Sequence, residues 1–248
     1  MRIAVVGTGL MGTSVLLAAE RAGFENVSIA DAELVVVAVP VRALPEVVSA
    51  VLATTSDSCT VTDVGSTKVS ICAAVGHSPR FVGGHPMCGG DLPSAELFDG
   101  ATWFLTKECV LVQEFVTAVG ATPVTIDPHV HDRLVALTSH LPHVLANLLA
   151  IQASEAARGA GPSLRDMTRV AGANPSVWVD IFLDNRDELL AALAEHRQAV
   201  GRLEAMLGDG DADALETWIA EAAVNRALYA RPPSSGSPAS FQSSLPPG

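Results

Sequence analysis

The chain has 248 residues, of which 49% are apolar and 17% charged, so two modest domains with substantial cores are possible. Its formal net charge of −12 excludes nucleic acid as a ligand, because phosphate binding needs a basic face. The mean hydropathy is +0.35, yet no uninterrupted apolar run approaches the roughly 18–20 residues of a membrane span, so we expect no membrane partner. We expect instead that a second copy of the chain covers part of the apolar surface.

The cysteine pattern predicts neither a metal site nor a redox pair. Cys59, Cys72, Cys88 and Cys109 show no CxxC spacing and no paired histidines. The chain enters a strand by residue 3, which leaves no room for a signal peptide. We therefore expect a cytoplasmic protein with reduced thiols.

In the first half, apolar strand-length segments alternate with helical segments, which predicts a parallel sheet covered on both faces. The expected strands are 2–7, 27–31, 34–39 and 61–64, with a further short segment at 80–84. Residues 101–106 and 122–126 are expected at the far edge of the same sheet. A helix rich in alanine should follow the first strand and end near Gly23.

A glycine-rich turn joins the first strand to this helix. Gly7, Gly9 and Gly12 have the GxGxxG spacing, directly after an apolar strand. Such glycines permit a tight turn, approach of the backbone to a pyrophosphate, and close helix–strand packing. The helix N-terminus adds free N–H groups for the phosphates. The predicted cofactor-binding residues of this turn are Gly7, Thr8, Gly9, Leu10, Met11 and Gly12.

Asp31 follows the second expected strand, 19 residues after Gly12. A carboxylate there would bind the adenosine ribose hydroxyls and favour NAD over NADP. Only Ala32 and Glu33 then separate Asp31 from the next strand, whereas parallel strands need a crossover of about a dozen residues. Either the dinucleotide fold is shortened here or the sequence omits residues, and we favour the omission.

The character of the chain changes after Asp127-Pro128. Apolar residues then recur at three- and four-residue spacing, which is helical, through expected helices near 163–171, 175–207 and 212–229. The fold class predicted is α/β, with a Rossmann-type parallel-sheet domain at 1–127 and an all-α domain at 128–231. Residues 232–248 are rich in Pro, Ser and Gly, which is typical of a disordered tail.

Several stretches together resemble the prephenate/arogenate dehydrogenase family of tyrosine biosynthesis. They occur in family order over residues 1 to about 230, and the HPM and SHLPH motifs are the specific ones. The stretches are the glycine turn, Val36–Pro40, Asp63–Lys68, Gly84–Gly89, Ser139–His143 and Trp178–Asn185. The resemblance implies an N-terminal dinucleotide domain, a helical dimerisation domain that forms a homodimer, and an active site between them.

The implied reaction is an NAD-dependent oxidative decarboxylation of prephenate or arogenate, which makes the ring aromatic. His140 is the predicted catalytic residue, because a neutral imidazole hydrogen-bonded to the ring hydroxyl can accept its proton. His143 lies three residues on, hence on the same helical face, and Pro142 should disrupt the backbone bonding beside them. Either histidine on its own would more often be a core residue; the motif favours the site.

The remaining expected site residues come from the same resemblance. His85, Ser139 and His143 are expected to contact the substrate, and Arg226 or Arg231 to bind its carboxylate, from the same chain or from the partner subunit. Arg165 and Arg169 are alternatives. Val39, Pro40, Ser66 and Lys68 are expected near the cofactor; an exposed position on a helix is the equal alternative for Lys68.

Two departures from the family leave alternatives open. The connections after Gly89 and Lys107 are short, and Ser94 cannot be equated with the family's substrate-binding serine. We interpret the three short connections, after Asp31, Gly89 and Lys107, as loops omitted from the sequence. No regulatory domain is recognised after the helices. The alternatives are a β-hydroxyacid dehydrogenase, disfavoured because no lysine lies on the first long helix of the second domain, and an inactive dinucleotide-binding homologue.

Overall fold

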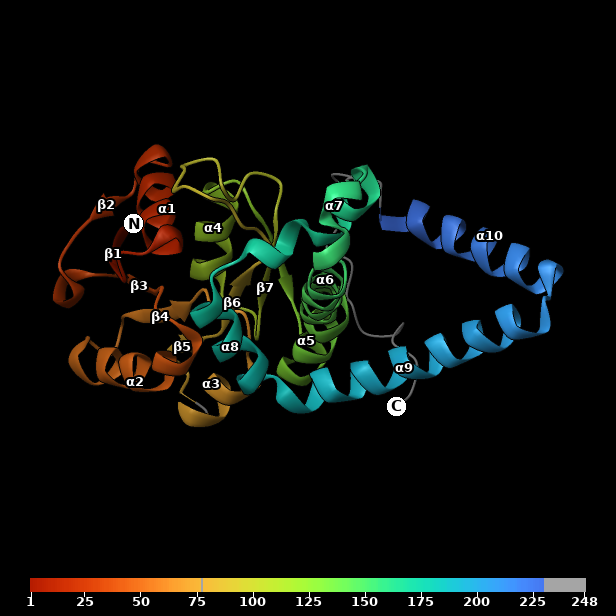
Figure 1. The fold of residues 1–248 in the computed structure, drawn as a ribbon. Helices are drawn as coiled ribbons and strands as arrows, with labels where there is room; N and C mark the ends of the chain where they lie inside the picture. The colour runs from red at the N-terminus through yellow and green to blue at the C-terminus, as the bar shows by residue number, and fades with distance from the viewer. Residues whose placement is uncertain (77, 230–248) are drawn as a thin grey trace.

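The computed structural model describes residues 1–76 and 78–229, which form a sheet-containing half and a helical half (Figure 1). The expected tail at 232–248 lies outside the described residues. This arrangement confirms the predicted fold class, an α/β Rossmann-type domain followed by an all-α domain.

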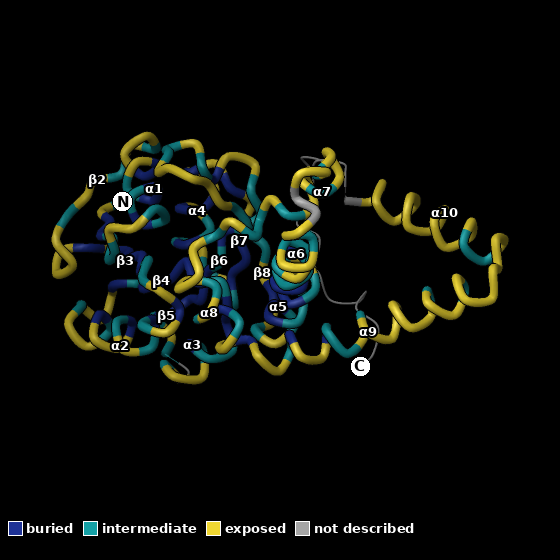
Figure 2. Tube along the Cα trace, viewed as in Figure 1, coloured by how far each residue is buried: buried dark blue, intermediate teal, exposed yellow. Residues whose placement is uncertain are grey.

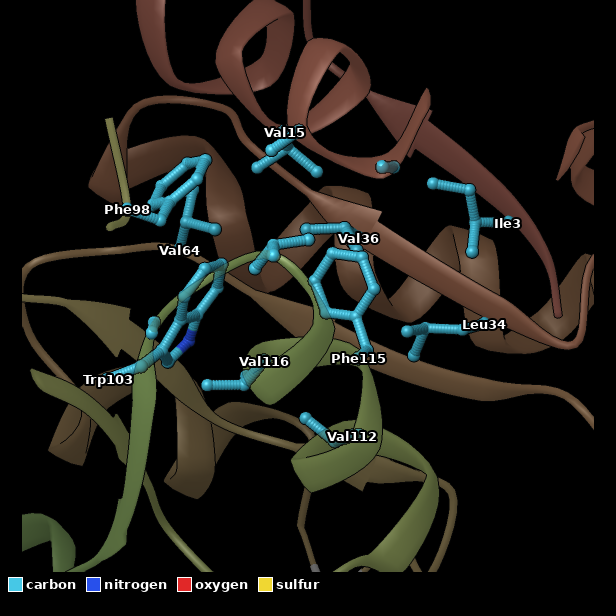
Figure 3. Close-up of a cluster of buried hydrophobic side chains, with 14 of the residues drawn as sticks. Ile3, Val15, Leu34, Val36, Val64, Phe98, Trp103, Val112, Phe115 and Val116 are labelled. Carbon is cyan, nitrogen blue, oxygen red and sulfur yellow. The ribbon is translucent and has the colours of Figure 1, made fainter. Parts of the chain in front are cut away.

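The first half is built on a five-stranded parallel sheet of order β2-β1-β3-β4-β5. In β3, Leu34 and Val36 pack on the side of α1 and α4, and Val35 and Val37 on the side of α2 and α3 (Figure 3). Both faces are thus buried, which explains the unbroken apolar run. The strands are β1 Arg2–Val6, β2 Glu25–Asn26, β3 Leu34–Val37, β4 Thr60–Asp63 and β5 Phe81–Val82; the helices are α1 Leu10–Arg21, α2 Leu44–Thr54, α3 Val69–Ala74 and α4 Val110–Ala118.

The segment between β2 and β3 differs from the expectation of a strand at 27–31. β2 is two residues long, and Ile29–Asp31 forms a 3-10 turn that leads straight into β3. The two strands flank β1 on opposite sides, so the chain crosses beneath β1 without a helix. The fold closes with this short crossing and with the short connections after Gly89 and Lys107, and the omission of residues there stays a prediction.

A second, three-stranded sheet corrects the expectation that residues 101–106 and 122–126 extend the first one. β6 Gly84–Pro86 pairs antiparallel with β7 Thr102–Leu105, which pairs parallel with β8 Thr122–Thr125. Trp103 of β7 nevertheless packs into the same core as Phe98 and Phe115 (Figure 3).

The helical half begins at Asp127, whose carboxylate accepts hydrogen bonds from the backbone N–H groups of His129 and Val130. α5 and α6 are continuous through a π-helical turn, and Asn185 separates α8 from α9 within the region expected as one helix. The segments are α5 Pro128–Val135, the π turn Ala136–His140, α6 Leu141–Gln152, α7 Pro162–Thr168, α8 Pro175–Asp184, α9 Arg186–Asp209 and α10 Ala212–Tyr229. α9 and α10 project from the rest of the molecule as a hairpin (Figure 1).

The continuous helix over Pro128–Gln152 is, by length and composition, apolar enough to cross a membrane, and 28% of its apolar window is buried. Polar residues interrupt this helix, so the sequence contains no unbroken apolar run of that length. Two of these, His131 and Asp132, are buried against the first half. The first turns of this helix are therefore packed against the first half of the chain.

Candidate active site

The parallel strands end along one edge of the five-stranded sheet, and the residues that follow them form one side of the site. Gly7 follows β1, Val39 and Pro40 follow β3, Ser66 follows β4, and His85 lies just beyond β5. In open α/β sheets ligands bind outside the carboxyl ends of the strands. The structure brings these predicted residues to that edge.

The glycine turn has the shape that a pyrophosphate requires. A Cβ on Gly7 or Gly12 would lie 2.1 Å from the carbonyl oxygen of Ala38 or Gly7, respectively, and Gly7 has a φ of 121°. A Cβ on Gly9 would meet nothing within 4 Å, so the backbone there faces open space. Gly9 also begins α1 without a side-chain cap, which leaves the first N–H groups of the helix available to phosphates.

Asp31 is not placed where the cofactor expectation requires it. It precedes β3 and accepts a hydrogen bond from Ser28 Oγ at 2.6 Å. Because Leu34 pairs with Ile3 in a parallel register, Asp31 lies at the amino edge of the sheet, opposite the glycine turn. The correction follows from the missing crossover, since β2 ends level with Ile3 and does not reach the carboxyl edge.

Lys68 follows β4 at the carboxyl edge of the sheet, but it is not an exposed helix residue. Its side chain is fully buried, forms an ion pair with Asp63, and donates to the carbonyl of Gly84 at 2.8 Å. Asp63 in turn accepts from the backbone N–H of Gly84 at 3.0 Å. The pair therefore holds both backbone groups of Gly84, the residue directly before His85.

His85 is joined to the helical half by hydrogen bonds. Its Nδ1 lies 2.8 Å from Nε2 of His131, and Nδ1 of His131 lies 2.7 Å from Oδ1 of Asp132. The carboxylate of Asp132 also accepts from the backbone N–H groups of Lys68 at 2.8 Å and Val69 at 2.9 Å. Burial, with the nearby His131, Lys68 and His140, holds the pKa of His85 well below its usual value.

His140 ends the π-helical turn, where the backbone N–H of Leu141 bonds the carbonyl of Ala136, five residues earlier. Pro142 has no N–H and explains this widened turn, which confirms the expected local disruption. The imidazole is 1% exposed, and its Nδ1 lies 3.2 Å from Nδ2 of Asn185. Burial lowers the pKa of His140 to about 4, so the ring is neutral at pH 7.

His143 lies one turn beyond His140 and stacks on Trp178 of α8, with ring centroids 3.3 Å apart. Burial and the positive charge of Arg169 lower the pKa of His143. Ser139 is half-buried on the π turn. Of the arginines considered, Arg169 is thus one whose charge acts on His143 within the same chain.

The other two predicted arginines lie elsewhere. Arg226 is exposed on α10, whose main packing partner is α9 and not the helix that carries His140. Arg231 lies outside the described residues. A contact of Arg226 with the site therefore requires a second subunit.

Four site residues escaped the sequence-based prediction as functional groups: His131, Asp132, Asn185 and Trp178. His131 lies four residues before the buried Val135, on the same helical face. The sequence alone could therefore have indicated a buried polar site at His131 and the adjacent Asp132. Asn185 donates to the backbone carbonyl of Asp132 at 2.8 Å as well as to His140, over 53 and 45 residues of sequence. Such contacts leave no periodic signal.

Together, the glycine turn, the parallel sheet and the histidines facing its carboxyl edge define a two-domain dehydrogenase that binds a dinucleotide. Residues 12–122 match the family model of the prephenate dehydrogenase nucleotide-binding domain, and residues 127–221 match that of the prephenate dehydrogenase dimerization domain. The chain belongs to the prephenate dehydrogenase family, and it is an NAD-dependent oxidoreductase.

Individual relatives agree with this assignment. The chain is 30% identical to cyclohexadienyl dehydrogenase of Zymomonas mobilis, over 76% of this chain and 72% of the relative. It is 25% identical to prephenate dehydrogenase of Lactococcus lactis, over 89% of this chain and 75% of the relative. That alignment runs over 265 positions, more than the whole chain has, so the relative carries residues that this chain lacks.

The fold matches a solved member of the family. The crystal structure of prephenate dehydrogenase from A. aeolicus, in complex with hydroxyphenyl propionate and NAD+, has a TM-score of 0.80 and 24% identity. The match covers 92% of this chain and 98% of that chain. The two-domain architecture is therefore retained despite the short connection between β2 and β3.

Proposed function

We propose that this enzyme oxidises and decarboxylates prephenate or arogenate, with the substrate bound between the carboxyl edge of the sheet and the helix that carries His140. The observation that carries this proposal is the convergence of His85 and His140, from the two halves of the chain, on one hydrogen-bonded network. The substrate ring hydroxyl needs such polar partners in a site otherwise lined by aromatic rings.

The glycine turn is the proposed pyrophosphate site, and Val39, Pro40 and Ser66 line the same edge towards the nicotinamide. NAD, when bound, accepts the hydride from the ring carbon that bears the hydroxyl. The chain supplies the remaining requirements: His140 hydrogen-bonds the hydroxyl, Ser139 and His143 border the substrate, and an arginine binds a carboxylate. Arg169 meets the last requirement within the chain, and Arg226 or Arg231 would meet it from a partner.

A homodimer is the proposed assembly. The exposed large apolar side chains concentrate on the helical half, among them Leu148, Ile151, Trp218 and Ile219. The tube of α9 and α10 is coloured as exposed along most of its length (Figure 2). A groove of about 560 Å³ between α9 and α10 is lined by Met206, Trp218 and Ala222 among others. Because α10 is exposed on almost every side, a second copy is the simplest cover for it.

We also propose a cytoplasmic location, as the sequence predicts. All four cysteines are free thiols in the structure, which suits a reducing compartment.

Turnover assays test the proposed reaction. NADH absorbance and released CO2 are measured with prephenate and with arogenate, and the kcat/KM ratio identifies the preferred substrate. His140→Asn should lower kcat on the order of 100-fold or more, with the Kd for NAD unchanged. His129→Asn is the matched control, because His129 is exposed on the same helix. Equal rates for wild type and His140→Asn would contradict the proposed role, and no turnover of either substrate by the wild type would contradict the function.

A further inference from the structure

Helix α8 lies between the two halves of the chain and presents a different face to each of them (Figure 1). On one face the ring of Trp178 stacks on His143, with ring centroids 3.3 Å apart. Asp180 and Asp184 are one turn apart and lie about 200° and 240° further round the helix, hence on the opposite face. Both carboxylates contact the first half of the chain.

The two carboxylates contact the segments that follow two neighbouring strands of the parallel sheet. Oδ1 of Asp180 lies 3.9 Å from Nε of Arg42, which belongs to the turn directly after β3. Oδ2 of Asp184 accepts a hydrogen bond from Ser70 Oγ at 2.7 Å, in the first turn of α3, which follows β4. The residues expected near the nicotinamide follow the same two strands. Helix α8 is thus joined to both segments that border the proposed cofactor site.

The stability of α8 itself does not explain these two carboxylates. Two negative charges one turn apart on a helix repel each other. Asp184 is also the last residue of α8, where the helix dipole disfavours a negative charge. Residues that break such local rules are expected at functional sites, where contacts elsewhere compensate for them. The compensating contacts are those with Arg42 and Ser70.

We propose, building on the function above, that Asp180 and Asp184 are positioning residues that couple the cofactor site to the substrate site through α8. With NAD bound against the segments after β3 and β4, Arg42 and Ser70 are held in place and fix the carboxylate face of α8. The opposite face then keeps the Trp178 ring in position to border the aromatic substrate. The substrate therefore binds more tightly to the NAD-loaded enzyme than to the free enzyme, and by linkage it tightens NAD binding by the same factor.

Isothermal titration calorimetry of the full-length protein measures this coupling without turnover. The probe is hydroxyphenyl propionate, the aromatic ligand in the crystal structure of the A. aeolicus relative. Saturating NAD should lower its Kd about fivefold or more in the wild type. Asp184→Ala and Ser70→Ala should each reduce this factor to about twofold, and the double variant no further, because the two residues share one contact. Combining Asp180→Ala with Asp184→Ala should bring the factor to about one.

Two further variants separate coupling from a general loss of stability. Asp184→Asn keeps an acceptor for Ser70 Oγ and should retain most of the coupling. Asp187→Ala is the matched control, because this exposed carboxylate contacts Arg186 within α9, and it should keep the wild-type factor. A wild-type Kd for hydroxyphenyl propionate that is the same with and without NAD would overturn the proposal. Full coupling in the combined Asp180→Ala and Asp184→Ala variant would also overturn it.

Steady-state turnover gives an independent measurement with the preferred substrate. The wild-type KM for that substrate should fall as the fixed NAD concentration is raised. The combined Asp180→Ala and Asp184→Ala variant should lose this dependence, while its kcat changes less than about threefold. A wild-type KM that does not depend on NAD would refute the coupling even if the enzyme is active. Failure to turn over either substrate would contradict the proposed function instead, and the calorimetry would still decide the coupling.

Discussion

His85 Nδ1 lies 2.8 Å from His131 Nε2, a contact that joins the end of the sheet to the first helix of the helical half. Three further contacts cross the same boundary. Ser70 Oγ donates to Asp184 at 2.7 Å, Arg42 lies 3.9 Å from Asp180, and Asp132 caps the backbone at Lys68. The position of His140 relative to the carboxyl edge is therefore fixed by polar contacts as well as by packing.

The glycine turn offers a prediction that separates binding from folding. Gly9→Ala should fold normally and raise the KM for NAD about tenfold or more, equivalent to ~1.4 kcal/mol, because its Cβ enters the open space proposed for the pyrophosphate. Gly12→Ala should instead destabilise the protein by about 1–3 kcal/mol, since its Cβ would meet the Gly7 carbonyl.

Thermal unfolding and steady-state kinetics measure the two effects. Asp31→Ala is the control, because Asp31 lies at the amino edge and its loss should leave the KM for NAD unchanged. A raised KM in Asp31→Ala, or an unchanged KM in Gly9→Ala, would contradict the placement of the cofactor.

The buried pair of Lys68 and Asp63 gives a second prediction. Lys68→Met should lower the free energy of unfolding by roughly 3–5 kcal/mol, because it leaves the Asp63 carboxylate buried without its cation. Lys107→Met is the matched control: among the described residues Lys107 donates to the carbonyls of Ser78 and Pro79, and its loss should cost about 1 kcal/mol.

Urea denaturation of the three proteins compares these costs. Adding Asp63→Asn to Lys68→Met should recover part of the stability, since the uncompensated charge is removed. A Lys68→Met variant as stable as wild type would show that the pair is not buried as described.

The sequence predicted the alternation of sheet and helix well, because residues such as Leu34–Val37 alternate between two buried faces and the glycine turn has its own spacing. The prediction of a strand failed at Val27–Asp31. This segment has an apolar composition typical of a strand, but it must pass under β1 to reach β3. The prediction also failed at β6, where the chain reverses direction, so that β7 and β8 form a separate sheet.

The site was predictable only in part, for a related reason. His140 and His143 are close in sequence and on one helical face, so a motif reveals them. The hydrogen-bonded pairs of the site are distant in sequence: His85 and His131 are 46 residues apart, and Asn185 and His140 are 45 residues apart. Such pairings depend on tertiary packing, which leaves no local pattern.

The buried histidines predict how stability depends on pH. The unfolded chain takes up a proton on each histidine near pH 6.5, whereas native His140 does so only near its pKa of about 4. Between these values the unfolded state binds more protons, so the free energy of unfolding must fall as the pH is lowered from about 6.5 to 4. His85 and His131, whose pKa values are also lowered by burial, act in the same direction.

Urea unfolding at several pH values between 7 and 4 measures this dependence. The contribution of His140 is at most about 3 kcal/mol, and His140→Asn should flatten the curve by that amount. His129→Asn should leave the slope unchanged, since His129 is exposed. An equal slope in wild type and His140→Asn would show that His140 is not buried in its neutral form.

The proposed homodimer leads to a prediction about which subunit supplies the substrate arginine. Sedimentation should give a dimer for the wild type and a monomer for Trp218→Glu, because a charge at this exposed apolar residue of the α9–α10 groove opposes burial by a partner. Leu92→Glu, at an exposed apolar residue of the first half, should remain dimeric. A dimeric Trp218→Glu would contradict the groove as part of the interface.

Mixing two inactive variants then tests whether Arg226 acts across that interface. If Arg226 serves the partner's site, a heterodimer of His140→Asn and Arg226→Ala places both defects in one site and leaves the other intact. A mixture refolded together should then recover roughly a quarter of wild-type activity, since half of the dimers carry one intact site of two. If Arg226 served the site of its own chain, each heterodimer site would carry one defect and no activity would return. Because α10 packs mainly on α9 within its own chain, the recovery of activity is the expected result.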